Sequence, residues 1–167
     1  ENIYNAYVTD PDLRAAYKEI RDQWDLTSVG RPSPDFKGQD INGKTLSLKD
    51  FNGKYLYIDV WATWCGPCKK EIPFLKELEK KFEGKNITFL SLSTDQNKTE
   101  WENMVKSGEL SGTQLLIGRG SQFQKDYNIN GIPHFILLDP EGKIVNASMI
   151  RPSSPDIEKV LNALPGI

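Results

Sequence analysis

The chain alternates between short runs of consecutive apolar residues and longer stretches in which apolar residues recur every three or four positions. The short runs are rich in β-branched and aromatic side chains, which is typical of buried strands. They predict strands at 55–61, 87–92, 114–117, 135–138 and 143–147. A hairpin is predicted at 36–48, because Asn42-Gly43 lies between its two extended halves.

The longer stretches have the spacing of amphipathic helices. They predict helices at 10–24, from residue 66 to about 84, at 98–107, at 119–127 and near the C-terminus. Asp10 and Pro11 are residue types that begin a helix, as are Ser154 and Pro155. In the last helix, the residues expected on the buried face are Ile157, Val160, Leu161 and Leu164.

The element order β-α-β-α-β-α-β-β-α predicts an α/β fold in which a mixed central sheet carries helices on both faces. A length of 167 residues suits one domain with a short appendage. Ser28–Pro34 contains one glycine and two prolines and is interpreted as a linker. We therefore divide the chain into an N-terminal helical segment and linker at 1–29, which also fits the tail of an upstream domain, and a main domain at 30–167.

Charge and composition exclude several classes of function. The chain has 21 Lys and Arg against 23 Asp and Glu, a formal net charge of −2, so no general attraction to nucleic acid or to an anionic membrane is expected. No apolar run approaches the roughly 18 residues that a membrane span requires, so no stable membrane insertion is expected. The sequence begins at Glu1 without an initiator Met or a signal peptide, which we interpret as a mature form or an excised part.

The only two cysteines lie in the segment WATWCGPC, where a predicted strand meets a predicted helix. Cys65 is expected at the helix N-terminus, where free N–H groups and the helix dipole stabilise a thiolate nucleophile. Pro67 suits the first turn, where its missing N–H costs nothing. Cys68 lies one turn further on, close enough to form a disulfide with Cys65. This geometry predicts that Cys65 attacks a partner's disulfide and that Cys68 resolves the mixed disulfide.

Asp59 is the candidate base that accepts the proton of Cys68. It lies on the predicted strand at 55–61, where burial should raise the pKa of its carboxyl toward neutrality. The alternative is a hydrogen-bonded strand residue with no part in proton transfer. Position alone does not separate these two interpretations.

Metal binding and peroxidase chemistry fit the sequence less well. A structural zinc site needs four Cys or His ligands and the chain offers Cys65, Cys68 and His134, so neither a metal nor another cofactor is expected. His134 is interpreted as a strand residue. A thiol peroxidase is a weaker alternative. Peroxiredoxins carry Thr or Ser three residues before the reactive cysteine and Pro four residues before that, whereas this chain has Ala62 and Ile58.

The segment 59–69 resembles the active-site segment of thioredoxin nearly position for position. By this resemblance, Asp59 matches the family's buried carboxylate, and Pro73 matches the proline that kinks its active-site helix. Gly131-Ile132-Pro133 matches the loop that holds the family's cis-proline.

The resemblance also assigns a substrate-binding surface. It implies that Pro133 packs against the disulfide and that the Ile132 backbone pairs with an extended substrate segment. The other residues that it assigns to this surface are Trp64, Gly66, Pro67 and Gly131.

Further features resemble the TlpA/ResA-like branch of envelope thiol–disulfide oxidoreductases. These are an inserted helix and strand at 95–117, the segment at 30–36 with the hairpin after it, and Asp-Pro-Glu-Gly-Lys at 139–143. The resemblance covers about 30–165. Two positions depart from thioredoxin: Ser91 stands where its lysine would align, and Ile150 stands where a glycine opens its docking surface. We therefore expect proton transfer and substrate choice to differ from those of thioredoxin.

Together, the residues and the resemblance predict a thioredoxin-like enzyme, a thiol–disulfide oxidoreductase that reduces protein disulfides through Cys65 and Cys68. The alternative from another class is a thioredoxin-like binding module without turnover.

The resemblance further implies a setting for this enzyme. The expected partners are disulfide-containing protein substrates and an upstream dithiol reductant, namely a membrane thiol–disulfide reductase, and the domain is expected to be monomeric. The expected location is the bacterial cell envelope, periplasmic or tied to the membrane by an anchor in the full-length protein, although cytoplasmic thioredoxins use the same motif. Cytochrome c maturation, general envelope disulfide reduction and redox signalling all fit.

Overall fold

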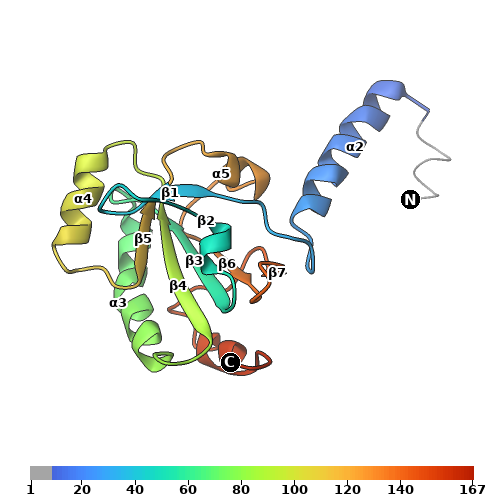
Figure 1. Cartoon of the computed structure of the whole chain (residues 1–167). Coiled ribbons are helices and arrows are strands. Elements are labelled where there is room, and N and C mark those ends of the chain that lie inside the picture. The colour runs from blue at the N-terminus through green and yellow to red at the C-terminus, as the bar shows by residue number, and fades with distance from the viewer. Residues whose placement is uncertain (1–8) are drawn as a thin grey trace.

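The computed structural model describes residues 9–167, and its centre is a seven-stranded mixed sheet (Figure 1). The strands lie in the order β2-β1-β5-β4-β3-β6-β7. Their bounds are β1 Lys37–Gln39, β2 Thr45–Ser47, β3 Tyr55–Trp61, β4 Ile87–Ser93, β5 Thr113–Leu116, β6 His134–Leu138 and β7 Ile144–Asn146. β3, β4 and β5 run parallel, whereas β6 pairs antiparallel with β3 and β1 pairs antiparallel with β5. The predicted hairpin and the predicted mixed sheet are both confirmed.

Helices cover both faces of this sheet. Their bounds are α2 Pro11–Leu26, α3 Gly66–Lys81, α4 Lys98–Lys106, α5 Gln122–Asp126 and α6 Ile157–Asn162, with a short 3-10 helix η1 at Leu48–Phe51. Side chains of α3 and α6 share one core layer, whereas those of α5 belong to the layer on the opposite face. The predicted α/β fold, with its thioredoxin-like arrangement of helices around the sheet, is therefore the observed one.

Strand β3 shows how the two core layers form. All seven of its residues are buried, because it has a neighbouring strand on each side and helices over both faces. Leu56, Ile58 and Val60 point into the layer with α5, whereas Tyr55 and Tyr57 point into the layer with α3 and α6. The strand therefore leads into the cysteine motif from a rigid sheet.

Part of the predicted linker is attached to the sheet. The Gly30 N–H donates to the Ile144 carbonyl at 2.8 Å, and the Ile144 N–H donates to the Arg31 carbonyl at 2.9 Å. A third bond joins the Ser33 N–H to the Gly142 carbonyl at 2.9 Å. These bonds pair the outer edge of β7, which would otherwise carry unpaired backbone groups. The stretch interpreted as a linker into the main domain is therefore paired with the sheet from Gly30 onward, a contact that glycine and proline spacing does not report.

The helix predicted at 119–127 begins later, as α5. Gly118 and Gly120 have positive φ angles of 76° and 71°, so the chain turns there instead of entering the helix. Ser121 is the N-cap, and its side chain accepts the N–H of Gln124 at 3.4 Å while Gln124 Oε1 accepts the N–H of Ser121 at 3.2 Å.

The C-terminal helix also begins later than predicted. Ser154 lies in a turn, since its carbonyl accepts the N–H of Ile157 at 3.2 Å, and the N-cap is Asp156. The prediction of Ser154 as cap is therefore wrong. Val160 is 37% exposed, so its place on the buried face is also wrong, while Ile157 and Leu161 are buried as predicted.

α2 projects away from the sheet in Figure 1. Asp10 caps it as predicted, and its carboxylate accepts the N–H groups of Asp12 at 2.8 Å and Leu13 at 3.2 Å. None of its residues is buried, and its last turns meet α5 through a hydrogen bond of 3.2 Å from the Gln23 amide to the Lys125 carbonyl. Residues 1–8 of the predicted N-terminal segment lie outside the described residues. Across residues 9–167, no helix combines the length and the apolar character of a membrane span.

Candidate active site

The cysteine motif forms the start of α3, directly after β3. Cys65 is the N-cap residue, and its Sγ accepts the backbone N–H of Cys68 at 3.2 Å. Pro67 lies in the first turn, where a backbone N–H has no partner to lose. The two cysteines form a disulfide with Cα atoms 5.3 Å apart. The fold therefore places both sulfur atoms where the sequence predicts them.

The two cysteines differ in position and not in exposure. Each exposes only 4% of its surface. The Sγ of Cys65 receives an N–H of the first helical turn and lies 3.8 Å from the carbonyl oxygen of Ile132, whereas Cys68 lies inside the helix. A negative charge on sulfur is stabilised at a helix N-terminus. The geometry therefore favours Cys65 as the nucleophile.

The Gly131-Ile132-Pro133 loop lies against the motif, although it is far away in the sequence. Its Ile132–Pro133 peptide bond is cis, as the resemblance to thioredoxin implies. Ile132 also packs against the apolar cluster that contains both cysteines. The contact of this loop with Cys65 is made by the Ile132 carbonyl, a backbone group that faces the reactive sulfur.

The surface beside Cys65 is open. Trp64 exposes 64% of its surface. At Gly66 and at Gly131, an added Cβ would find no atom within 4 Å, so neither glycine is required by packing. Trp64, Gly66 and Gly131 are therefore exposed positions around the buried Cys65.

Asp59 lies on β3 with its carboxyl in the buried interior. In the sheet register it is paired with Ser91 of β4 and with Phe135 of β6. The pKa of Asp59 is raised to about 8, mainly by burial and also by the charges of Glu71 and Glu79, against a hydrogen bond with Ser91 that lowers it. The raised pKa that the sequence predicts is therefore present, and Ser91, at the position of the missing lysine, acts directly on this carboxyl.

Glu71 is a second buried carboxylate that sequence reasoning missed. It follows Cys68 by three residues on α3 and is 6% exposed. Its carboxylate accepts the Ser153 N–H at 3.0 Å and the Ser153 hydroxyl at 2.9 Å, and it pairs with Arg151 at 3.4 Å. The signal was available, because Glu71 lies at helical spacing between Cys68 and Leu75 on the buried face of α3.

Asp95 fixes the segment that precedes Cys65. It is 3% exposed and lies just after β4, at the same end of the sheet as the motif. Its carboxylate accepts the Thr63 N–H at 3.0 Å, the Thr63 hydroxyl at 2.6 Å and the Ser93 hydroxyl at 2.6 Å. Sequence reasoning missed this residue, since nothing local to it indicates a contact with Thr63.

The inserted element brings apolar side chains to the cysteines. Trp101 of α4 is fully buried in a cluster with Trp61, Ala62 and the two cysteines. Met104 and Val105 of the same helix pack against this cluster. The insertion predicted at 95–117 is therefore part of the wall of the active site.

His134 is the first residue of β6. Its Nε2 lies 2.8 Å from the Ala147 carbonyl oxygen, a contact that agrees with its interpretation as a strand residue. In the part of the chain from 9 to 167, no group of three or more His, Cys, Asp or Glu side chains is arranged to hold a metal ion.

Comparison with known proteins gives consistent matches. The family model described as Redoxin matches residues 28–164. The thiol-disulfide oxidoreductase ResA of Bacillus thuringiensis subsp. konkukian is 31% identical over 136 residues, which cover 81% of this chain and 78% of that protein.

Solved structures match over a similar range. A provisionally named thiol-disulfide oxidoreductase from Bacteroides vulgatus is 58% identical, with a TM-score of 0.72 over 80% of this chain and 88% of that one. The thioredoxin domain of a second thiol-disulfide oxidoreductase from the same organism is 34% identical, with a TM-score of 0.72 over 81% of this chain and 96% of that one.

Proposed function

Because this chain belongs to the Redoxin family and is a thiol–disulfide oxidoreductase, we propose that it works as a reductase of protein disulfides. The observation that carries the proposal is the Cys65–Cys68 pair at the start of α3, with the Ile132 carbonyl 3.8 Å from the Cys65 Sγ. This arrangement offers one sulfur as nucleophile and keeps the other within bonding distance of it.

The reaction is a pair of thiol–disulfide exchanges. In the reduced protein, the Cys65 thiolate attacks one sulfur of the partner's disulfide, which breaks that bond and releases the partner's other sulfur as a thiolate. The Cys68 thiolate then attacks the Cys65 Sγ, which breaks the mixed disulfide and frees the partner's first sulfur. Two electrons pass to the partner, and the protein is left with the Cys65–Cys68 disulfide.

Asp59 is proposed as the acceptor of the Cys68 proton in the second exchange. A carboxyl with a pKa of about 8 exchanges protons near neutrality, as a general base for a thiol requires. Its strand leads directly into the motif, and strand alternation places Asp59 on the same face of β3 as Tyr55 and Tyr57, the face that packs against α3.

The substrate segment is proposed to lie across the open surface beside Cys65. Ile132 and Pro133 would hold the backbone of an extended segment, as in β-strand addition. The remaining residues of this proposed surface are Trp64, Gly66, Pro67 and Gly131.

We propose the bacterial cell envelope as the location and a membrane thiol–disulfide reductase as the electron donor. Support comes from the resemblance to the envelope branch of the family. Proteins that await cytochrome c assembly are candidate substrates there, because their cysteines must be reduced before haem attachment. We also propose that 30–167 is the catalytic domain and that 1–29 is a separate segment, since the family match begins at residue 28.

The direction of electron flow is tested by equilibration with glutathione buffers and by reduction of insulin. We expect a reduction potential nearer to about −270 mV, the value of thioredoxin, than to about −120 mV, the value of a strong oxidant. Insulin reduction should proceed with the parent protein and stop in Cys65→Ser. A Cys65–Cys68 pair that does not cycle would favour the binding module instead.

A further inference from the structure

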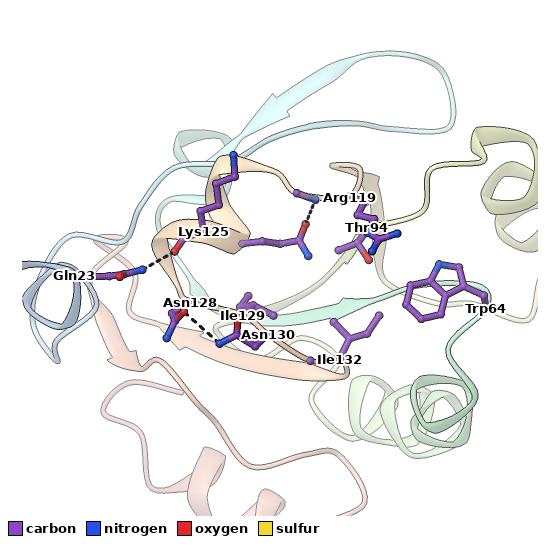
Figure 2. Close-up of a pocket in the computed structure, with 12 residues that line it drawn as sticks. Gln23, Trp64, Thr94, Arg119, Lys125, Asn128, Ile129, Asn130 and Ile132 are labelled. Carbon is purple, nitrogen blue, oxygen red and sulfur yellow. Dashed lines mark hydrogen bonds between the residues drawn. The ribbon is translucent and has the colours of Figure 1, made fainter. Parts of the chain in front are cut away.

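A groove of about 920 Å³ opens beside the cysteine motif (Figure 2). We call it the α5 groove, and the residues that define it are Trp64, Arg119, Gln124, Lys125, Asn128 and Ile132. In Figure 2, Trp64 marks one end and Gln23 of α2 marks the other. Trp64 precedes Cys65 in the sequence and the Ile132 carbonyl lies 3.8 Å from the Cys65 Sγ, so one end of the groove adjoins the residue that a partner must reach. Its volume is in the range of binding sites for ligands.

The α5 groove carries positive charge and no negative charge. Of the described residues that line it, Arg119 and Lys125 are cations and none is Asp or Glu. Both cations are exposed, and neither forms an ion pair with another described residue. Arg119 lies toward the Trp64 end in Figure 2, and Lys125 lies nearer to Gln23. The fold therefore leaves two cations along this groove without a counter-charge.

The amides of the groove add hydrogen-bond donors. Oε1 of Gln124 accepts the N–H groups of Gly120 at 2.8 Å and Ser121 at 3.2 Å. Oδ1 of Asn128 accepts the side-chain amide of Asn130 at 3.3 Å. The Gln124 oxygen is fully used by these two bonds, so the NH₂ group of Gln124 is left to bind a ligand, and the NH₂ group of Asn128 is a second donor at the groove. Cations and NH₂ groups together suit a ligand rich in carboxylate and carbonyl oxygen.

We propose that the α5 groove binds the part of a protein substrate that adjoins the cysteine attacked by Cys65, and that it favours substrates with Asp or Glu in that part. The proposal rests on the reductase function proposed above and adds the chemistry of the preferred substrate. Arg119 is the main specificity-determining residue, because it is the cation nearer to the Trp64 end.

The test uses three peptides, each closed by one intramolecular disulfide and carrying a fluorophore and a quencher. They differ only in the residues beside one cysteine. The acidic peptide has Asp and Glu there, the amide peptide has Asn and Gln, and the basic peptide has Lys. The reduced protein is mixed with each peptide in a single turnover, and the second-order rate constant of peptide reduction is measured at low and at physiological salt. We expect the acidic peptide to react about two- to fivefold faster than the amide peptide at low salt, the effect of an exposed ion pair. Salt should shrink this ratio.

Charge reversal at one position identifies the responsible cation. Arg119→Glu should invert the ratio between acidic and amide peptides, and Arg119→Lys should preserve its direction. Lys54→Glu is the matched control, because it makes the same change of charge at an exposed site before β3, at the strand end opposite the motif. It should leave the ratio unchanged.

Equal rates on all three peptides, or a preference that survives Arg119→Glu, would overturn the groove proposal while leaving the reductase function intact. The neutral compound hydroxyethyl disulfide distinguishes failure of the groove proposal from failure of the reductase function, because it carries no charge for the groove to bind. If the reduced parent protein reduces neither this compound nor any peptide, the reductase function is wrong and the groove proposal falls with it.

Discussion

Ser91 lies directly beside Asp59 in the parallel register of β4 with β3, and it forms a hydrogen bond with the Asp59 carboxyl. The neutral Ser91 hydroxyl therefore lies beside the buried Asp59 carboxyl, at the position where thioredoxin has a lysine. Without a nearby cation, burial dominates and the pKa of Asp59 rises to about 8. At neutral pH most of the Asp59 carboxyl is therefore protonated in the folded protein, and the minority that is ionised is the form that can accept a proton.

Because the folded protein holds this proton, its stability should fall as the pH rises. The ordinary pKa of Asp59 is 3.8, and its folded value is about 8, so between these values the folded protein holds a proton that the unfolded chain releases. The free energy of unfolding of the disulfide form should then decrease with pH by up to about 1.4 kcal/mol per pH unit and level off above pH 8. Denaturant unfolding from pH 5 to pH 9 measures this slope.

Asp59→Asn is the control for that slope, because an amide keeps the shape and does not titrate. Its pH dependence between 5 and 8 should be flatter than that of the parent protein. Equal slopes in the two proteins would show that Asp59 does not hold the extra proton.

Two neighbours should move the pKa of Asp59 in opposite directions. Ser91→Ala removes a hydrogen bond that lowers this pKa, so the pKa should rise. Glu71→Gln removes a negative charge that raises it, so the pKa should fall. The carbon resonance of the Asp59 carboxyl, followed by NMR in the disulfide form, reports this titration free of interference from the cysteines. Shifts of the same sign in both variants would contradict the account.

Asp95 is expected to stabilise the segment before Cys65. In Asp95→Asn, one carboxylate oxygen is replaced by an NH₂ group, which cannot accept a hydrogen bond. A buried bond from Thr63 or Ser93 is therefore lost. We expect a loss of about 1–3 kcal/mol in the free energy of unfolding. Hydrogen exchange at the Thr63 amide should also accelerate.

Asp156→Asn is the matched control for Asp95, since Asp156 is exposed and its side chain makes no capping hydrogen bond. It should change stability by no more than about 0.5 kcal/mol. Similar losses in both variants would indicate a general effect of charge instead of the Thr63 network.

The inserted helix is expected to support the fold through Trp101. This side chain is 0% exposed, so Trp101→Ala leaves a large cavity beside the cysteine pair and should cost roughly 3–5 kcal/mol. Trp24→Ala changes the same residue type at a site that is 70% exposed and should have little effect. Guanidinium unfolding of the two variants compares them directly. Equal stability would mean that α4 packs only loosely on the active site.

Much of the fold could be predicted because the decisive signals are local. The strand at 55–61, its junction with the Cys65–Cys68 motif and the hairpin around Asn42-Gly43 all lie within short windows of sequence. The cis bond before Pro133 required a family resemblance, since no local pattern specifies it.

What could not be predicted depends on contacts between distant segments. The pairing of Gly30 with Ile144 and the contact of Asp95 with Thr63 join residues that only the completed sheet brings together. Glu71 is different, because its place on the apolar face of α3 could have indicated a buried carboxylate, although its partner Ser153 lies far along the chain.

The central claim is that Cys65 attacks and Cys68 resolves, and trapping of the mixed disulfide tests it most directly. Reduced Cys68→Ala, incubated with a disulfide-bonded peptide and quenched with acid, should yield a covalent adduct that peptide mapping places on Cys65. Reduced Cys65→Ala should yield little adduct, and the parent protein should release the reduced peptide. An adduct that forms mainly on Cys68 of the Cys65→Ala protein, with none on Cys65 of the Cys68→Ala protein, would contradict the account.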